Sequence, residues 1–383
     1  MMSRSLGILT VTLMLAAGGH AIGQSMAPDR DRAVFVDDTD HVKEELMRRA
    51  GTPTEETASK PPVLKAVLAP RAIPTSPAVF RQAWHEKPIS QDLTGQCWAF
   101  ASTSFFESEI HRRSGRAIKL SEMYTVYWEF VDKARHFVAT QGRSRFTRGS
   151  EADATIRVWH RYGIVPAAAY PGRPVGRDFF DDRLAFAEML SALKETRERA
   201  DWNEERVVAD IRTILDRHFG PPPTRVEVDG QSLTPLEYLR DVVQLDLTGY
   251  VTLISLLQEP EYAFTALPVP DNWWNSQDYF NVPLADFVRV LRAATEAGPS
   301  LCCTIDRTEP GFLPRQDIAV IPTFDIASSS IDDAARQLRF SNGSTTDDHL
   351  VHCVGFYEGD GHRWYLIKDS ETQPRNGHHG GYM

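Results

Sequence analysis

The sequence predicts an α+β fold, in which helices and strands occupy different parts of a 383-residue chain. Apolar residues recur at helical spacing from Trp98 to Arg113, and again in two runs between residues 181 and 220. Near the C-terminus, one β-like run begins at His349 and a second ends at Asp369. With 42% hydrophobic residues the chain can bury a large core, and its length suggests two or three structural units.

Residues 1–23 predict an export signal, because Arg4 precedes an apolar core and small residues follow at Ala21 and Gly23. An uncleaved interfacial helix is the alternative. No later apolar run is long enough to cross a membrane, so we expect an exported protein, periplasmic or secreted, without a membrane anchor. Residues 24–75 are rich in Pro, Thr, Ser, Ala and charge, which predicts a mostly flexible leader with one short helical stretch. A pro-segment that covers an active site is the alternative.

The net charge of −10 argues against a nucleic-acid-binding protein. Four cysteines are too few for a disulfide scaffold. Cys302, Cys303 and Cys353 lie in β-like runs, where buried free thiols are expected and an inter-strand disulfide is the alternative. His378 and His379 are not accompanied by further metal-ligand spacing, so we expect a solvated loop, and no metal or organic cofactor.

In chain order, the first helix is expected from Trp98 to Arg113 and is ended by Ser114-Gly115. Two amphipathic helices follow in the region between 181 and 220. The stretch 234–237 is a capping box with Pro at the first helical position, which starts another helix. Two strands joined by the turn at 358–362 then bring His349 and Asp369 side by side.

These elements place chemically active residues together. Cys97 comes directly before the first helix, where unpaired N–H groups and the helix dipole stabilise a thiolate. A thiolate nucleophile needs a base, for which His349 is the candidate, with Asp369 orienting the ring. Gln91 can offer its side-chain amide to an oxyanion, together with the N–H of Cys97. His352 is the competing base, although strand alternation points it to the other face.

Three blocks carry a family resemblance: Gln91–Phe100 with Cys-Trp-Ala-Phe, Asp348–Gly355 with Asp-His, and Leu366–Ser370 with Lys-Asp-Ser. In this order they resemble the papain-like cysteine peptidases. In that family the histidine follows the cysteine by roughly 130–150 residues. Here His349 follows Cys97 by 252 residues, so about a hundred residues are inserted. A mainly helical insertion, with "TPLEYLRD", "LTGYVTLIS" and "YFNVPLADFVRVL", resembles the bleomycin hydrolase and aminopeptidase C branch.

The resemblance implies a papain-like two-lobed fold with a cleft between the lobes. Residues 76–175 would form the helical lobe, 176–275 the mainly helical insertion, and 276–383 the β-barrel-like lobe. The sequence ends at Gly-Gly-Tyr-Met, where the family continues into a final strand and tail, so we expect either that the C-terminal end is truncated or that this protein lacks the tail. With no tail in the cleft, the chain as given is expected to accept N-terminally blocked peptides. The alternative is that an acidic residue binds the free amino group of the substrate.

Three residues depart from the family pattern. Asp369 stands where the family usually has asparagine, and its charge would raise the basicity of His349. Glu371 stands where the family commonly has a tryptophan that shields the histidine. The pair of substrate-binding glycines has Gly149 and Ser150 as its counterpart.

The expected function is a cysteine peptidase that hydrolyses peptide bonds through a thioester on Cys97, similar to aminopeptidase C. His349 would act as general base and acid. An inactive papain-fold binding protein and a thiol acyltransferase or amidase are the alternatives. The expected partner is a peptide or protein substrate, and homo-oligomerisation is left open.

Overall fold

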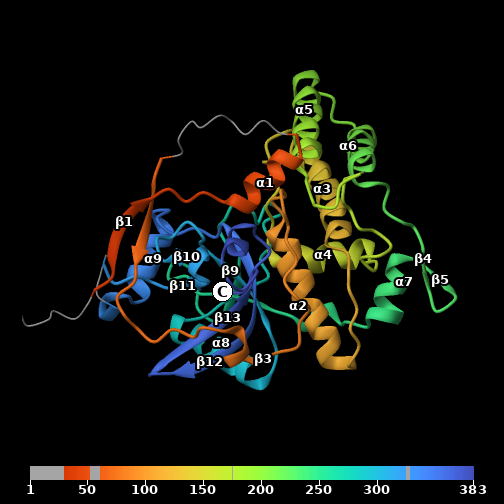
Figure 1. Ribbon diagram of the computed structural model, residues 1–383. Coiled ribbons are helices and arrows are strands. Elements are labelled where there is room, and N and C mark those ends of the chain that lie inside the picture. The colour runs from red at the N-terminus through yellow and green to blue at the C-terminus, as the bar shows by residue number, and fades with distance from the viewer. Residues whose placement is uncertain (1–29, 52–60, 175, 325–327) are drawn as a thin grey trace, which may run out of the picture.

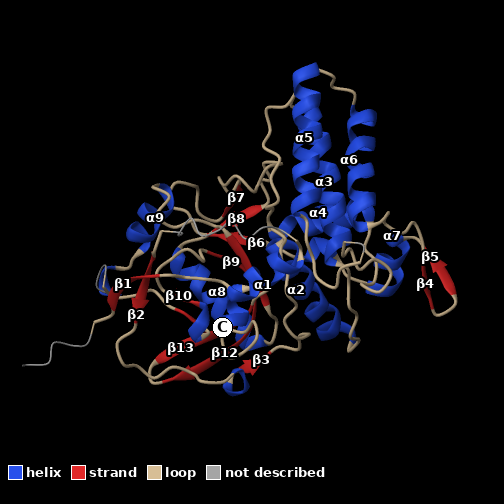
Figure 2. Cartoon of the chain, turned by 45° about the horizontal axis from the view of Figure 1, so that its top comes forward, coloured by secondary structure: helices blue, strands red, loops and turns tan. Residues whose placement is uncertain are grey.

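A computed structural model describes residues 30–51, 61–174, 176–324 and 328–383. The predicted export signal and part of the leader lie outside the described residues. The α+β class is confirmed, because in these ranges five helices follow one another between residues 97 and 219 and most of the strands come after them. Figure 1 and Figure 2 show helices α2 to α6 gathered on one side and strands β9, β12 and β13 on the other. Within the described residues no helix is long and apolar enough to span a bilayer.

The helices are α1 (His41–Arg49), α2 (Cys97–Ser114), α3 (Glu122–Ala139), α4 (Ala152–Tyr162), α5 (Arg183–Arg199), α6 (Glu204–Phe219), α7 (Pro235–Glu237), α8 (Leu284–Ala297) and α9 (Asp333–Ser341). The strands are β1 (Arg32–Val36), β2 (Val63–Val67), β3 (Arg81–Gln82), β4 (Val226–Val228), β5 (Gln231–Leu233), β6 (Thr252–Ile254), β7 (Ala263–Thr265), β8 (Tyr279–Asn281), β9 (Leu301–Ile305), β10 (Phe312–Leu313), β11 (Ile318–Ala319), β12 (His349–Gly359) and β13 (His362–Lys368).

The described part of the leader contains regular structure, where a mostly flexible segment was expected. Strands β1 and β2 pair antiparallel over their full length. Helix α1 inserts Leu46 between Leu93 and Phe179, so it packs on the body of the molecule. Asp40 also accepts hydrogen bonds from Thr372 and Asn376, close to the end of the chain. The sparse apolar residues of this segment are thus supplemented by polar contacts that a sequence pattern does not reveal.

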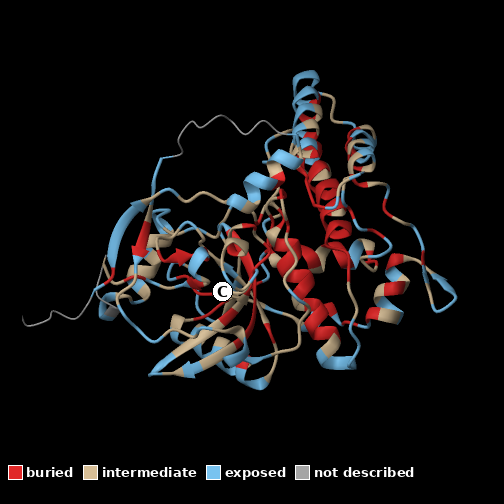
Figure 3. Cartoon of the chain, viewed as in Figure 1, coloured by how far each residue is buried: buried red, intermediate tan, exposed pale blue. Residues whose placement is uncertain are grey.

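The main core lies among α2, α3, α4 and α6. Its largest fully buried side chains include Trp98, Phe130, Trp159 and Ile211. Figure 3 shows these helices buried on the sides that face each other. Burial of this apolar surface supplies most of the stabilisation, at roughly 25 cal/mol per Å².

The central sheet is antiparallel, with β12 in its middle. Strand β13 pairs with one edge of β12, while β9 and then β3 pair with the other. The β12–β13 connection is a tight turn, in which Asp360 and Gly361 both have positive φ angles of 53° and 76°. This geometry is that of a two-residue hairpin, as the sequence predicted. Helix α2 packs against β12 and so joins the two sides of the molecule.

The segment 176–275 is less uniformly helical than predicted. Helices α5 and α6 form the two expected amphipathic helices and pack with α3. The capping box at Thr234 is present, but α7 lasts one turn and continues as a π-helical segment, Tyr238–Val243. The stretch around Thr252–Ile254, which was read as helical, is a strand paired with β8. This segment contains the β-branched residues Thr252 and Ile254, and its backbone groups form hydrogen bonds within the small sheet.

Candidate active site

Helix α2 begins at Cys97, so the thiol lies at a helix N-terminus. No side chain caps this end: Gln96 is the capping residue, and its amide instead bonds Asp182 and Trp98. Cys97 is a free thiol and only half-buried. The unneutralised positive end of the helix dipole therefore favours negative charge on the sulfur.

The His349 ring lies between the thiol and a carboxylate. Its Nε2 is 2.9 Å from Oδ1 of Asp369, and both residues are 1% exposed. The ring also lies close enough to Cys97 for the two groups to interact, and with Nε2 on Asp369 the other nitrogen remains for the sulfur. Strand β12 starts at His349, and Asp369 directly follows β13, so the hairpin brings the two together.

Burial of the ring lowers the pKa of His349, but Asp369 and then Cys97 more than offset this effect. The pKa of His349 therefore lies well above its ordinary value. Burial raises the pKa of Asp369, yet His349, the N–H of Glu371 and Arg375 hold it below its ordinary value. The surroundings thus favour a protonated His349 ring between the Asp369 carboxylate and the Cys97 sulfur.

Gln91 lies beside this group, and its side-chain amide is already hydrogen-bonded. Its Nε2 donates to the Thr94 carbonyl at 3.0 Å and to Oε1 of Glu371 at 3.2 Å. Its Oε1 accepts from the Ser370 hydroxyl at 2.6 Å. Glu371, which stands where the family commonly has tryptophan, therefore holds the donor that was expected to face an oxyanion.

Arg307 is a site residue that the sequence analysis did not single out. Its guanidinium lies 3.5 Å from the Glu371 carboxylate and close enough to interact with the charges of Cys97 and Asp369. It follows β9, whose last residue, Ile305, lies opposite His349 in the sheet. The sequence signal for Arg307 is a charged residue that comes directly after a strand. That strand pairs with the one that begins at His349.

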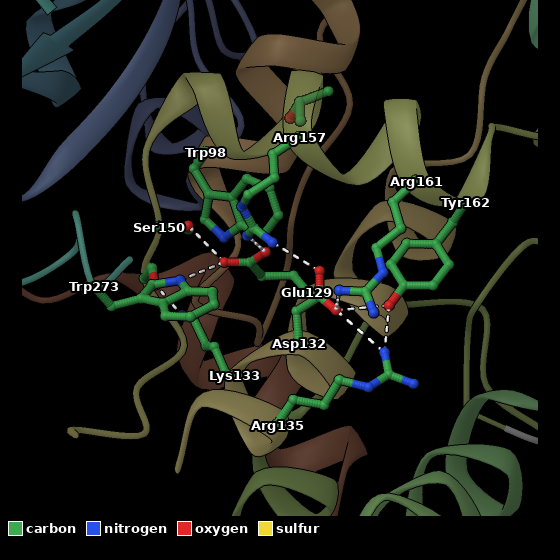
Figure 4. Close-up of polar contacts among 12 residues, drawn as sticks. Trp98, Glu129, Asp132, Lys133, Arg135, Ser150, Arg157, Arg161, Tyr162 and Trp273 are labelled. Atoms are coloured by element: carbon green, nitrogen blue, oxygen red, sulfur yellow. Dashed lines mark hydrogen bonds and ion pairs between the residues drawn. The ribbon is translucent and has the colours of Figure 1, made fainter. Parts of the chain in front are cut away.

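Gly149 and Ser150 precede α4 and lie near the Cys97 end of α2, since Trp98 Nε1 donates to the Arg148 carbonyl at 3.3 Å. The Ser150 hydroxyl points inward and donates to Glu129 at 2.8 Å, as Figure 4 shows. Lys133 donates to the Gly149 carbonyl. A Cβ at Gly149 would lie 2.0 Å from the Asp271 carboxylate, so any other residue there would require Asp271 to shift. The Gly149 carbonyl and the Ser150 hydroxyl are therefore already bonded to other groups of the protein.

His352 and the other three cysteines have surroundings that do not suit a catalytic base or nucleophile. His352 is buried, bonds the Ser104 hydroxyl of α2 at 2.7 Å and has a pKa well below its ordinary value because of burial and Lys368. Cys302, Cys303 and Cys353 are free thiols as expected, but only Cys353 is a buried residue, and Cys302 and Cys303 are half-buried. Burial raises the pKa of each, to about 11 for Cys353. These thiols are poorly suited to act as nucleophiles at neutral pH. No group of three or more His, Cys, Asp or Glu among the described residues is arranged to hold a metal ion.

Comparisons with known proteins were made by sequence and by structure. No protein-family model matches the chain. It is 25% identical over 236 residues to Aminopeptidase C of Listeria innocua, covering 52% of each chain. It is 23% identical over 197 residues to Aminopeptidase C of Lactococcus lactis subsp. cremoris, covering 43% of this chain and 45% of the relative. The chain is thus similar in sequence to aminopeptidase C proteins over about half of its length. This confirms the resemblance that the sequence blocks indicated.

The chain spans about half the length of the curated aminopeptidase C relatives that it matches. In structure it is similar to PepW from Lactobacillus rhamnosis HN001, with a TM-score of 0.59 and 17% identity, over 80% of this chain and 78% of PepW. At this identity the similarity supports the fold alone.

Proposed function

We propose that the chain is a cysteine peptidase of the aminopeptidase C type, with Cys97 as nucleophile and His349 as general base and acid. The observation that carries the proposal is the His349 ring, held 2.9 Å from Asp369 and close to the thiol at the start of α2. A thiolate beside an imidazolium is an activated nucleophile.

In the proposed reaction the Cys97 thiolate attacks the scissile carbonyl carbon. The oxyanion that forms is stabilised by the N–H of Cys97 and by Gln91 once Glu371 releases its amide. His349 gives its proton to the leaving amine, and a thioester remains on Cys97. Water then attacks the thioester, with His349 taking a proton, and the free acid leaves. Asp369 keeps the ring oriented through both halves.

We also propose export to a periplasmic or extracellular space, on the basis of the signal pattern in residues 1–23. Fractionation of cells that make the full-length chain tests this. Recovery of a shortened chain outside the cytoplasm supports the proposal, and a full-length cytoplasmic chain opposes it.

Hydrolysis of a panel of fluorogenic aminoacyl and peptidyl amides tests the peptidase proposal, with two matched cysteine variants. We expect Cys97→Ala to abolish hydrolysis at an unchanged Tm. Cys302→Ala removes a thiol of β9 whose sulfur is buried. We expect this variant to lower Tm while turnover stays close to that of the native chain. Equal loss of activity in both variants, at unchanged Tm, would contradict the assignment.

A further inference from the structure

Four acidic side chains meet on the Gly149 side of the candidate site. Glu151 caps the start of α4 and is 3% exposed, and Asp153 follows in the first turn. Asp271 comes from the loop between β7 and β8, and Asp347 lies two residues before His349. The buried Cys302 thiol interacts with the charges of both Cys97 and Glu151, so this cluster lies close to the nucleophile.

In the part of the chain that the structure describes, two of the four carboxyl groups, those of Asp153 and Asp271, have a cation beside them, whereas the other two do not. Asp153 accepts a hydrogen bond from the Tyr279 hydroxyl at 2.9 Å and also faces Arg157. Asp271 faces Lys133. In contrast, Glu151 Oε1 and Asp347 Oδ2 are buried atoms that receive no hydrogen bond from any described residue. A buried carboxylate oxygen without a donor or a cation is costly, and a group that brings a positive charge and N–H donors would remove this cost.

The carboxyl groups of Glu151 and Asp347 lie next to each other, although they come from the start of α4 and from the residues just before β12. They lie within hydrogen-bonding reach, so they can share a proton. Burial, followed by Asp347, Asp153 and Asp271, raises the pKa of Glu151 to about 9. Burial also raises the pKa of Asp347, which faces Glu151, Asp271 and Asp348. A cation that enters between them would replace this proton.

The chemistry of the site favours an organic cation. No group of three or more metal-ligating side chains among the described residues has the geometry for a metal ion, which leaves an ammonium group as the natural partner of two adjacent carboxylates. The nearby cations Lys133 and Arg157 are held elsewhere, by backbone carbonyls and by Glu129 and Asp132.

We propose that Glu151 and Asp347 together bind a protonated amine of the peptide substrate next to the scissile bond. The inference rests on the proposed peptidase function. The amine is either the free α-amino group of the substrate or the side chain of a lysine near the cleaved bond. In both cases the two carboxylates would determine specificity, because a neutral group would leave them buried and unpaired.

Two matched substrate pairs test the proposal and separate the two sources. The first pair is Ala-Ala-aminomethylcoumarin with and without an N-acetyl group. The second is N-acetyl-Lys-Ala-aminomethylcoumarin and its norleucine counterpart. We expect the amine-bearing member of one pair to react roughly tenfold to a hundredfold faster in kcat/KM, in the range for a charge-assisted contact. The pair that shows the preference identifies the source.

The variants Glu151→Gln and Asp347→Asn should each reduce that preference to a few-fold or less, chiefly by slowing hydrolysis of the amine-bearing member. Glu151 makes no side-chain capping bond to α4, so its amide should not weaken the helix. Glu188→Gln, which removes a carboxylate from α5 that pairs with Arg217, is the matched control. An unchanged preference in both variants, or an equal loss on all four substrates, would overturn the proposal.

Binding separates this proposal from the peptidase proposal itself. If no substrate is hydrolysed, the peptidase proposal fails, and calorimetry still tests the amine site with two pairs of peptides: Ala-Ala-amide and its N-acetyl form, and N-acetyl-Lys-Ala-amide and its norleucine counterpart. We expect binding of one amine-bearing peptide at neutral pH to release a proton, seen as a heat that depends on the buffer, and Glu151→Gln to abolish this release. Equal affinity for amine-bearing and neutral peptides would refute the amine site.

Discussion

The charge of Asp369 distinguishes this site from one with asparagine at the same place. Because Asp369 raises the pKa of His349, the imidazolium persists to higher pH, and the alkaline limb of kcat/KM is displaced upward. Asp369→Asn keeps a hydrogen-bond acceptor and removes the charge. We expect this variant to move the alkaline limb down by about one pH unit or more, in the range for one close charge. A pH profile with an unmoved limb would show that the charge does not act on the ring.

Gln91 is a second residue whose role can be tested directly. We expect Gln91→Ala to lower kcat by roughly tenfold to a thousandfold with little change in KM, as for the loss of one oxyanion donor. Steady-state kinetics on one fluorogenic peptide measures both parameters.

The controls for Gln91 come from its neighbours and from a similar amide. Gln373→Ala removes an amide that bonds Asp38 instead, and it should leave kcat unchanged. Glu371→Gln removes the charged acceptor of the Gln91 amide and should not lower kcat. A defect of Gln91→Ala confined to KM would remove Gln91 from the oxyanion-binding role.

At the scale of elements, local patterns in the sequence predicted the parts that hold the site. The start of α2 at Cys97 and its end at Gly115 follow from helical spacing and a left-handed C-cap. The β12–β13 hairpin follows from two β-like runs and the Asp-Gly turn. What sequence reasoning missed depends on distant partners: Gln91 meets Glu371 across 280 residues, and Arg307 reaches the site only through strand pairing.

The connection between α4 and the 176–275 segment depends on one glycine. Gly163 has a φ of +74°, and a Cβ there would lie 2.2 Å from the backbone carbon of Pro235. Because backbone cannot rotate away, we expect Gly163→Ala to lower the free energy of unfolding by more than the about 1–2 kcal/mol of left-handed strain alone. Chemical denaturation measures the loss.

Gly220→Ala is the matched control for this position. Its φ is +80°, but nothing lies within 4 Å of the added Cβ, so only the conformational strain remains. If the two alanine variants lose the same stability, the close approach of Pro235 has no energetic weight.

At the scale of the whole molecule, a buried charge network joins α3, α4 and the loop that carries Trp273. Arg157 donates to Asp132 at 2.7 Å and pairs with Glu129, which also accepts from Trp273 at 2.7 Å (Figure 4). Arg157→Met would leave two buried carboxylates without their main cation. We expect it to cost about 3–5 kcal/mol of stability at neutral pH.

The pH dependence of this loss has a definite sign. Burial raises the pKa of Glu129, but Arg157 and Lys133 hold it below its ordinary value. The network therefore contributes stability above the unfolded pKa of Glu129, and this is lost as pH falls through the folded pKa. The difference between Arg157→Met and the native chain should shrink in acid. Arg161→Met, which removes an exposed partner of Asp132, should cost less than about 1 kcal/mol, and equal costs for both arginines would contradict the account.

The central claim, that Cys97 carries the acyl group of the substrate, is tested most directly by trapping this intermediate. The purified protein is mixed with an excess of a fluorogenic substrate, quenched in acid within a turnover, and mapped by peptide mass spectrometry. We predict an acyl mass on the peptide that contains Cys97 and on no peptide that contains Cys302, Cys303 or Cys353. Hydrolysis of the substrate with no acyl adduct on Cys97, or with the adduct on another cysteine, would contradict the account.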